Sequence, residues 1–245
     1  MRIMIVEDDD LHLCFLREAV HSSELEFDTL IETSTGDEAL AALDNDTVDM
    51  LVLDLQIPGK SGIDIARAAW ALNPETPILF WSNYADEAYI RGIRRIAPAS
   101  AVYGYLLKTS SQARLMRTLF GVLVDRQMII DQALTSDSVI NKNEVEKLSA
   151  AEYEVLLDIA IGLTDSAIAR HRSLSTRTVQ GRLHSLYAKL GLSSTDTNHA
   201  VSGEDMNRRC RAVALALYHR IINTKIIELS ERELMEKAGN SEFLH

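Results

Sequence analysis

The chain has 245 residues, of which 47% are hydrophobic and 25% charged, and its formal net charge at pH 7 is −11. This length allows two domains with separate cores, and the composition excludes a disordered chain. No apolar run reaches the ~20 residues of a membrane span, no signal peptide precedes the first strand-like segment, and the two cysteines, Cys14 and Cys210, lie far apart. We therefore expect a cytoplasmic protein with reduced thiols.

Strand-like and helix-like segments alternate through the first half of the chain. Five such repeats predict an α/β domain with a doubly wound, five-stranded parallel sheet and helices on both faces. The expected strands span residues 2–7, 26–32, 48–54, 77–82 and 101–106, and the expected helices span 9–21, 36–44, 61–72, 85–95 and 110–130.

Acidic residues follow two of these strands. Asp54 comes directly after a short apolar run, so it should lie at the C-terminal end of a buried strand, where ligands collect in open α/β sheets. Glu7 and Asp8 follow the first strand and would converge with Asp54 if the two strands are neighbours. Oxygen ligands of this kind suit Mg²⁺. A helix N-terminus also favours acids, which explains Asp9 and Asp10 but leaves Asp54 unexplained.

Two further polar residues end strands at the same edge of the predicted sheet. Ser82 ends the fourth strand, and Lys108 follows the fifth. Each alone is typical of an ordinary surface position. Together with the acids, a hydroxyl and an ammonium there would hold the oxygens of a phosphoryl group, which makes Asp54 a candidate phosphoacceptor.

The second half of the chain has no comparable strand. Its expected helices span residues 149–162, 165–172, 176–190, 205–223 and 225–238, and the polar stretch before them is typical of a linker. We expect an α/β domain at 1–131, a linker at 132–147, a helical domain at 148–222 and a C-terminal helical extension at 223–245.

The third of these helices combines an apolar stripe with a polar, basic face. Residues 162–190 carry five arginines or lysines and a single acid, Asp165, although the whole chain is acidic. Such a face suits the major groove of DNA, where Gln or His side chains read base edges and Arg or Lys side chains hold phosphates. The alternative is an ordinary surface helix of an α-bundle.

Residues 1–131 resemble the receiver domain of bacterial two-component response regulators. The resemblance rests on the acidic run that follows Val6, on Asp54 with Pro58 and Gly62, on Ser82 five residues after Pro77, and on Tyr105 three residues before Lys108. It implies that Asp54 accepts a phosphoryl group from a sensor histidine kinase. It also implies that Asp8 binds Mg²⁺ (or Mn²⁺) directly, Glu7 through water and Gln56 through its backbone carbonyl, that Ser82 and Tyr105 form a switch pair, and that Lys108 contacts the phosphoryl oxygens.

Residues 148–192 resemble the LuxR-type helix–turn–helix of the NarL/FixJ family. The matching residues are Leu148, Glu152, Val155, Leu156, Gly162, Leu163, Ile168, Ala169, Ser175, Thr178, Val179 and the run 189–192. The resemblance implies that Gln180, Gly181 and His184 face bases, that Ser175, Arg177, Thr178 and Lys189 serve the DNA backbone, and that Arg182 also lies at the DNA contact. Arg182 stands where the family usually has His, and Ala167 where it usually has Glu.

We therefore expect a transcriptional response regulator that binds promoter DNA as a homodimer once Asp54 is phosphorylated. It would not be an enzyme beyond its own phosphorylation and dephosphorylation. The alternative is a protein-interaction regulator or phosphate sink whose helical domain has lost specific DNA binding. Two departures from the family bear on the output: about four extra residues near 94–100, and the extension 223–245, which either packs on the helical domain or mediates dimerisation.

Overall fold

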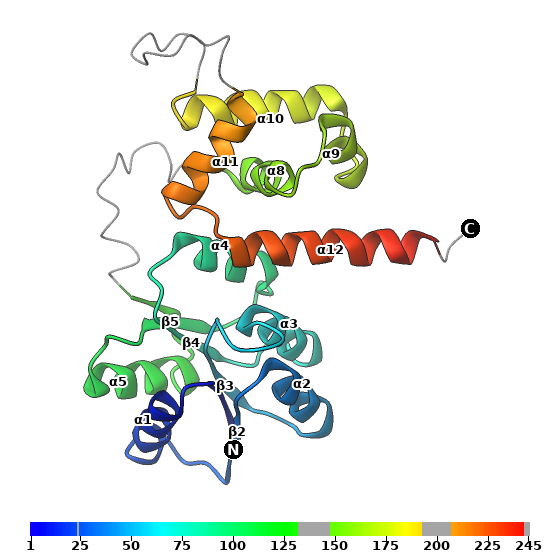
Figure 1. The fold of residues 1–245 in the computed structure, drawn as a ribbon. Coiled ribbons are helices and arrows are strands. Elements are labelled where there is room, and N and C mark those ends of the chain that lie inside the picture. The colour runs from blue at the N-terminus through cyan, green and yellow to red at the C-terminus, as the bar shows by residue number, and fades with distance from the viewer. Residues whose placement is uncertain (24, 132–147, 193–206, 243–245) are drawn as a thin grey trace. The chain divides into compact units, whose positions relative to one another are not determined.

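The computed structural model describes residues 1–23, 25–131, 148–192 and 207–242 (Figure 1). The predicted linker, 132–147, lies outside the described residues. The chain divides into two compact units, one built on a β-sheet and one formed by the later helices. No helix in the described ranges is both long and apolar enough to cross a membrane.

The first unit contains a parallel sheet with strand order β2-β1-β3-β4-β5-β6. Helices α1 and α5 pack together on one face, and α2 and α3 pack together on the other (Figure 1). The strands are β1 (Arg2–Val6), β2 (Thr29–Thr33), β3 (Met50–Leu53), β4 (Ile78–Ser82), β5 (Tyr103–Leu107) and β6 (Ile129–Ile130), and the helices are α1 (Asp10–His21), α2 (Gly36–Asn45), α3 (Gly62–Leu72), α4 (Glu87–Ile96) and α5 (Gln112–Leu123).

The predicted α/β architecture is confirmed, and the central strands show why the sequence reveals it. Every residue of β3 and β4 is buried. Strands that are covered by helices on both faces become nearly continuous apolar runs, which are easy to recognise. The first and third strands are neighbours, which is the condition for their acidic residues to converge, since Val6 of β1 pairs with Leu53 of β3.

The predicted helix over 110–130 is too long at its C-terminal end. The sheet also has a sixth strand, where five were predicted. Helix α5 stops at Leu123, and Arg126 turns the chain with a φ of 56°. The two-residue strand β6 then pairs with β5. Gly121 leaves room for this return, because a Cβ there would lie 2.7 Å from Cδ1 of Ile129. A strand of two residues is too short to show a periodicity of its own.

The second unit is helical, as predicted. Helix α10 packs on α8 and α9, while α11 and α12 both contact α8. Ser149 and Glu152 form a capping box at the start of α8, Gly162 ends that helix with a φ of 90°, and Ser175 caps α10. The bounds are α8 (Ala150–Ala160), α9 (Asp165–His171), α10 (Thr176–Lys189), α11 (Arg208–Tyr218) and α12 (Thr224–Glu242).

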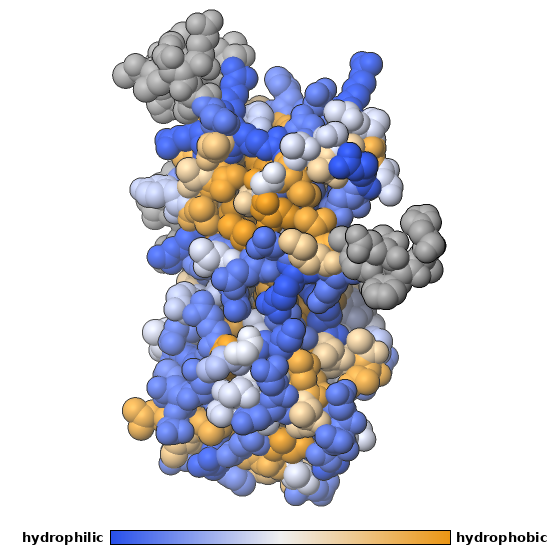
Figure 2. Space-filling view, turned by 45° about the vertical axis from the view of Figure 1, so that its right-hand side comes forward, coloured by the Kyte–Doolittle hydropathy of each residue, from blue (hydrophilic) through white to orange (hydrophobic). Residues whose placement is uncertain are grey.

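The C-terminal extension forms α12, which is longer than the predicted 225–238. Its contact with α8 favours the interpretation that the extension packs on the helical unit, and a role in dimerisation stays a prediction. Apolar residues are also visible on the surface of this unit (Figure 2). Among its described residues, the exposed large apolar side chains include Leu217, Tyr218 and Met235.

Candidate functional site

Three carboxylates meet at the C-terminal edge of the sheet. Glu7 and Asp54 directly follow paired strand residues, and the Asp54 N–H donates to the carbonyl of Val6 at 2.9 Å. One carboxylate oxygen from each of Glu7, Asp8 and Asp54 lies within 4.8 Å of the others. Glu7 is 1% exposed and Asp54 6% exposed, whereas Asp8 is exposed. This arrangement fits a divalent cation that enters from solvent, because two buried acids and one exposed acid offer it oxygen ligands.

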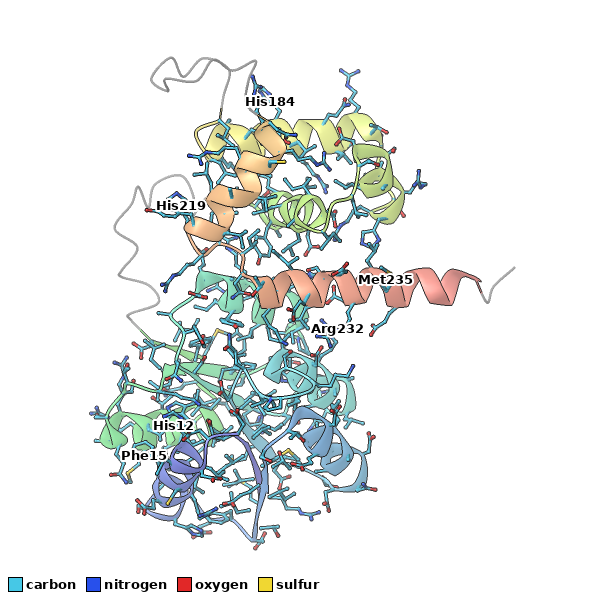
Figure 3. All side chains as sticks on the ribbon, in the orientation of Figure 1. His12, Phe15, His184, His219, Arg232 and Met235 are labelled. Carbon is cyan, nitrogen blue, oxygen red and sulfur yellow. The ribbon has the colours of Figure 1, made fainter. Side chains whose placement is uncertain are left out.

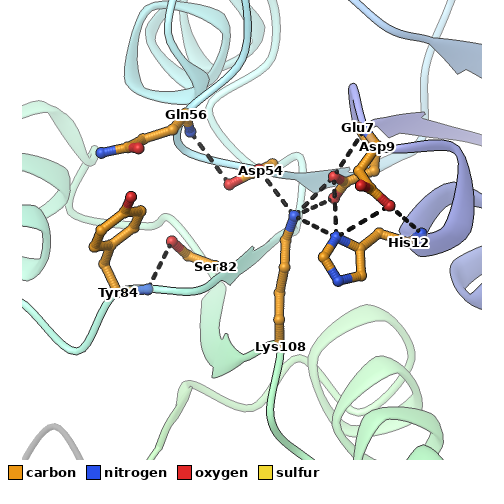
Figure 4. Close-up of polar contacts among 8 residues, drawn as sticks. All are labelled: Glu7, Asp9, His12, Asp54, Gln56, Ser82, Tyr84 and Lys108. Atoms are coloured by element: carbon orange, nitrogen blue, oxygen red, sulfur yellow. Dashed lines mark hydrogen bonds and ion pairs between the residues drawn. The ribbon is translucent and has the colours of Figure 1, made fainter.

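Lys108 joins two of these carboxylates. Its Nζ lies 2.7 Å from both oxygens of Glu7 and 2.9 Å from Oδ2 of Asp54 (Figure 4). The lysine side chain is only 3% exposed. Burial raises the pKa of the Glu7 carboxyl, and the hydrogen bond and charge of Lys108 oppose that rise. One ammonium therefore offsets part of the charge of three acids, and the remaining negative charge favours a cation.

His12 is a member of this cluster that sequence reasoning missed. Asp9 caps α1 by accepting from the backbone N–H of His12 at 2.9 Å, so His12 lies in the first turn of α1, beside the acidic cluster. Nδ1 of His12 lies 3.3 Å from Nζ of Lys108 and 3.5 Å from Oδ1 of Asp9 (Figure 4). The available signal was the position of His12 three residues after a capping Asp at the edge where the acids gather.

The predicted switch residues are both completely buried, and both are tied to Tyr84. The backbone N–H of Tyr84 donates to Oγ of Ser82 at 3.3 Å, and the hydroxyl of Tyr105 donates to the carbonyl of Tyr84 at 2.6 Å. The strand ends of Ser82 and Lys108 are also joined, since the Lys108 N–H donates to the Ser82 carbonyl at 2.9 Å. A movement of the Tyr84 backbone would therefore change a hydrogen bond of each predicted switch residue.

The turn after Asp54 is shaped by close backbone approaches. The N–H of Gln56 donates to Oδ1 of Asp54 at 3.2 Å. A Cβ on Gly62 would lie 2.2 Å from the carbonyl oxygen of Asp54, so only glycine lets α3 begin this close to the site. Gly59, in the same turn, has a φ of 78°, a backbone conformation that favours glycine.

The segment 94–100, which was predicted to carry extra residues, contains the end of α4. It continues into a turn in which the Ala101 N–H donates to the carbonyl of Pro98.

In the helical unit, α10 presents most of the residues predicted to face DNA. The apolar stripe of Val179, Leu183 and Leu186 is buried. A Cβ on Gly181 would meet no described atom within 4 Å, so backbone is accessible there. Arg182 is half-buried, whereas His184 is exposed (Figure 3). The exposed members of the predicted set are Ser175, Arg177, Thr178, Gln180, Gly181 and His184.

Lys189 is engaged inside the unit, unlike the exposed residues of α10. Its Nζ lies 2.6 Å from Oε2 of Glu152, and the Ser185 hydroxyl donates to Oε1 of the same carboxylate at 2.5 Å. The Ser149 N–H adds a third hydrogen bond, of 2.7 Å. Burial alone would raise the pKa of Glu152, but the lysine and these donors together lower it to about 2. The predicted contact of Lys189 with a DNA phosphate would have to compete with this pair.

We expect Glu152→Gln to lower the free energy of unfolding of the helical unit by about 3 kcal/mol at pH 7, since a pKa lowered from 4.5 to about 2 corresponds to that amount. A lowered pKa stabilises the folded state above the ordinary pKa of 4.5, and this contribution is lost as the pH falls toward 2. Hydrogen exchange of the α8 and α10 amides measures the effect.

The matched control for Glu152→Gln is Glu228→Gln, because Glu228 is 59% exposed and pairs with Lys225 at 3.4 Å. This surface pair should contribute under about 0.5 kcal/mol. Equal effects of the two substitutions, or a Glu152→Gln deficit that does not shrink between pH 4.5 and 2, would contradict the role given to Glu152.

This fold and this edge of the sheet define a class of protein, a receiver domain combined with a helix–turn–helix. The family model of the response regulator receiver domain matches residues 3–120, and that of the bacterial regulatory proteins of the luxR family matches residues 146–198. The chain belongs to the NarL/FixJ family of response regulators, which combine these two domains, and is a two-component response regulator.

Individual relatives agree with this assignment. The chain is 30% identical over 158 residues to the oxygen regulatory protein NreC of Staphylococcus aureus, covering 60% of this chain and 71% of NreC. It is 26% identical over 215 residues to the DNA-binding transcriptional activator DevR/DosR of Mycobacterium tuberculosis, covering 85% and 96%. The solved complex of the two-component response regulator RcsB with DNA shares the fold, with a TM-score of 0.53, 20% identity and coverage of 79% and 93%.

Proposed function

We propose that this chain regulates transcription by accepting a phosphoryl group on Asp54 from a sensor histidine kinase, with Mg²⁺ or Mn²⁺ bound at Glu7, Asp8, Asp54 and the carbonyl of Gln56. The observation that carries the proposal is the placement of the buried Asp54 carboxylate 2.9 Å from a buried ammonium, beside two further acids. The domain limits 1–131, 132–147, 148–222 and 223–245 are part of the same proposal.

The transfer step requires Asp54 to act as a nucleophile. A carboxylate oxygen of Asp54 attacks phosphorus, the bond between phosphorus and the donor nitrogen of a phosphohistidine breaks, and an acyl phosphate forms. A divalent cation would supply charge neutralisation for the incoming phosphoryl oxygens. Lys108 would supply a second positive charge for these oxygens, because its Nζ lies 2.9 Å from Oδ2 of the Asp54 carboxylate. Ser82 and Tyr105 are proposed to transmit the change as the switch pair.

The proposed output is binding of double-stranded promoter DNA by a homodimer. The exposed side chains of Gln180 and His184 would read base edges across the accessible backbone of Gly181, while Ser175, Arg177 and Thr178 would hold phosphates. Two copies suit DNA because half-sites related by symmetry reward a two-fold partner. The engagement of Lys189 and the half-buried position of Arg182 reduce the number of cations free to bind phosphates.

Two measurements on the full-length chain test the proposal. Acetyl phosphate with Mg²⁺ should add the mass of one phosphoryl group. The phosphorylated (labelled) chain should bind one duplex sequence selectively, with an affinity that falls as the salt concentration rises. Unchanged mass under conditions that label a control receiver would overturn phosphoryl acceptance. A labelled chain that selects no duplex would instead favour the protein-interaction regulator.

A further inference from the structure

The ammonium of Lys108 has more neighbours than the two carboxylates of the proposed phosphoryl site. An ammonium has three protons to donate, and its hydrogen bonds to Oε1 of Glu7 and Oδ2 of Asp54 use two of them. The third neighbour is Nδ1 of His12, which lies 3.3 Å from Nζ, 3.5 Å from Oδ1 of Asp9 and 3.7 Å from Oε1 of Glu7 (Figure 4). His12 accepts from Lys108 in the tautomer whose Nδ1 carries no proton, because only an unprotonated ring nitrogen accepts a hydrogen bond.

An indole ring supports both His12 and Lys108. Nζ of Lys108 lies 5.2 Å from the centroid of the Trp81 ring, within the range of a cation–π contact. The ring of His12 meets Trp81 at 79°, with 5.4 Å between centroids, and Phe15 stacks on Trp81 at 5.8 Å. His12 and Phe15 both lie on α1 (Figure 3).

Trp81 is a rigid support because of where it lies. It is 1% exposed and belongs to the hydrophobic core between the sheet and helices α1 and α5. A side chain packed on all sides keeps one orientation. The ammonium, at the end of a four-carbon chain with many rotamers, is thus confined on one side by the indole and on another by the imidazole.

We propose that His12 and Trp81 are positioning residues that hold the Lys108 ammonium beside Asp54 for phosphoryl transfer. This inference rests on the proposed function and adds two residues to it. Neither residue touches the carboxylate that reacts; each acts through Lys108. Confining the ammonium before the phosphoryl group arrives removes an ordering cost from the transfer step.

The test compares rates of phosphorylation of the full-length chain by acetyl phosphate with saturating Mg²⁺. His12→Leu removes the acceptor and keeps much of the volume, and should slow the labelling of Asp54 about five- to tenfold, the usual effect of one lost hydrogen bond. His12→Asn keeps an acceptor near the place of Nδ1 and should restore the rate to within about twofold. His21→Leu is the matched control, because His21 lies on the same helix and packs on Phe27.

A spectroscopic measurement tests the part given to Trp81. The chain has two tryptophans, so in the Trp70→Phe variant all tryptophan emission comes from Trp81. Lys108→Met in that background removes the cation that lies 5.2 Å from the indole centroid and should change the Trp81 emission. Unchanged emission on removal of the ammonium would overturn the contact of Lys108 with Trp81.

The outcomes separate this inference from the proposed function. A wild-type chain that takes no label contradicts the proposed function itself. A labelled wild type with an equally fast His12→Leu variant contradicts only the positioning role. Equal slowing by His12→Leu and His12→Asn, with both variants folded by thermal unfolding, shows that an acceptor at this position is not what matters and also overturns the role.

Discussion

Asp54→Asn should abolish phosphorylation of the chain by acetyl phosphate and Mg²⁺, and should remove any effect of the phosphodonor on DNA affinity. The amide of Asn lacks the charge and the nucleophilicity of the carboxylate. The fold should survive, because the amide oxygen can still accept from the N–H of Gln56, as Oδ1 of Asp54 does at 3.2 Å. Intact mass measured before and after treatment reads out the first effect, and a duplex-binding titration reads out the second.

Asp9→Asn is the matched control for this substitution. Asp9 lies in the same acidic run, but its side chain caps α1, a role that Asn also performs well. The control should take the label as the wild type does. Labelling of the Asp54→Asn variant would place the phosphoryl group on another acid of the cluster, and loss of labelling in Asp9→Asn would show that the assignment to Asp54 alone is too narrow.

The sheet unit was predictable because its signals are repeated and independent. Apolar runs mark the central strands, and the ends of parallel strands converge at one edge of a sheet. These two facts place Glu7, Asp54 and Lys108 at one edge of the sheet, and the strand order then brings them together. The distances between them, and the near-complete burial of the lysine, follow from packing that a single sequence does not display.

Features that depend on a neighbour distant in the sequence escaped prediction. Strand β6 pairs with β5 where Ile129 lies close to Gly121, a contact that a helical pattern through 110–130 conceals. His12 contacts Lys108 and Trp81, which lie on other elements. Lys189 is a residue that the family resemblance assigns to the DNA backbone, yet it pairs with Glu152, a contact between two helices that the sequence does not display.

Lys108→Met should lower the free energy of unfolding of the sheet unit by roughly 3 kcal/mol at pH 7 without divalent cations, because the substitution leaves two buried carboxylates without their shared partner. Lys108 lowers the pKa of Glu7, so its removal raises that pKa further. A raised folded-state pKa costs stability as the pH rises through it. The deficit should therefore be small below the ordinary pKa of 4.5 and complete above the raised value.

Mg²⁺ should recover most of this loss. A cation that binds only the folded state at 100 times its dissociation constant stabilises by about 2.7 kcal/mol, and in the variant it no longer competes with an ammonium. Both tryptophans, Trp70 and Trp81, lie in the sheet unit, so denaturant unfolding followed by tryptophan emission measures this unit alone.

Arg17→Met supplies the comparison for Lys108→Met within the same unit. Arg17 makes two hydrogen bonds of 2.6 Å to Glu32, but its side chain is 43% exposed, so the pair should contribute at most about 1 kcal/mol and should not respond to Mg²⁺. If Mg²⁺ stabilised Lys108→Met no more than it stabilises Arg17→Met, the cation would not share its site with the ammonium. The carboxylates of Glu7 and Asp54 would then need a different explanation for their burial together.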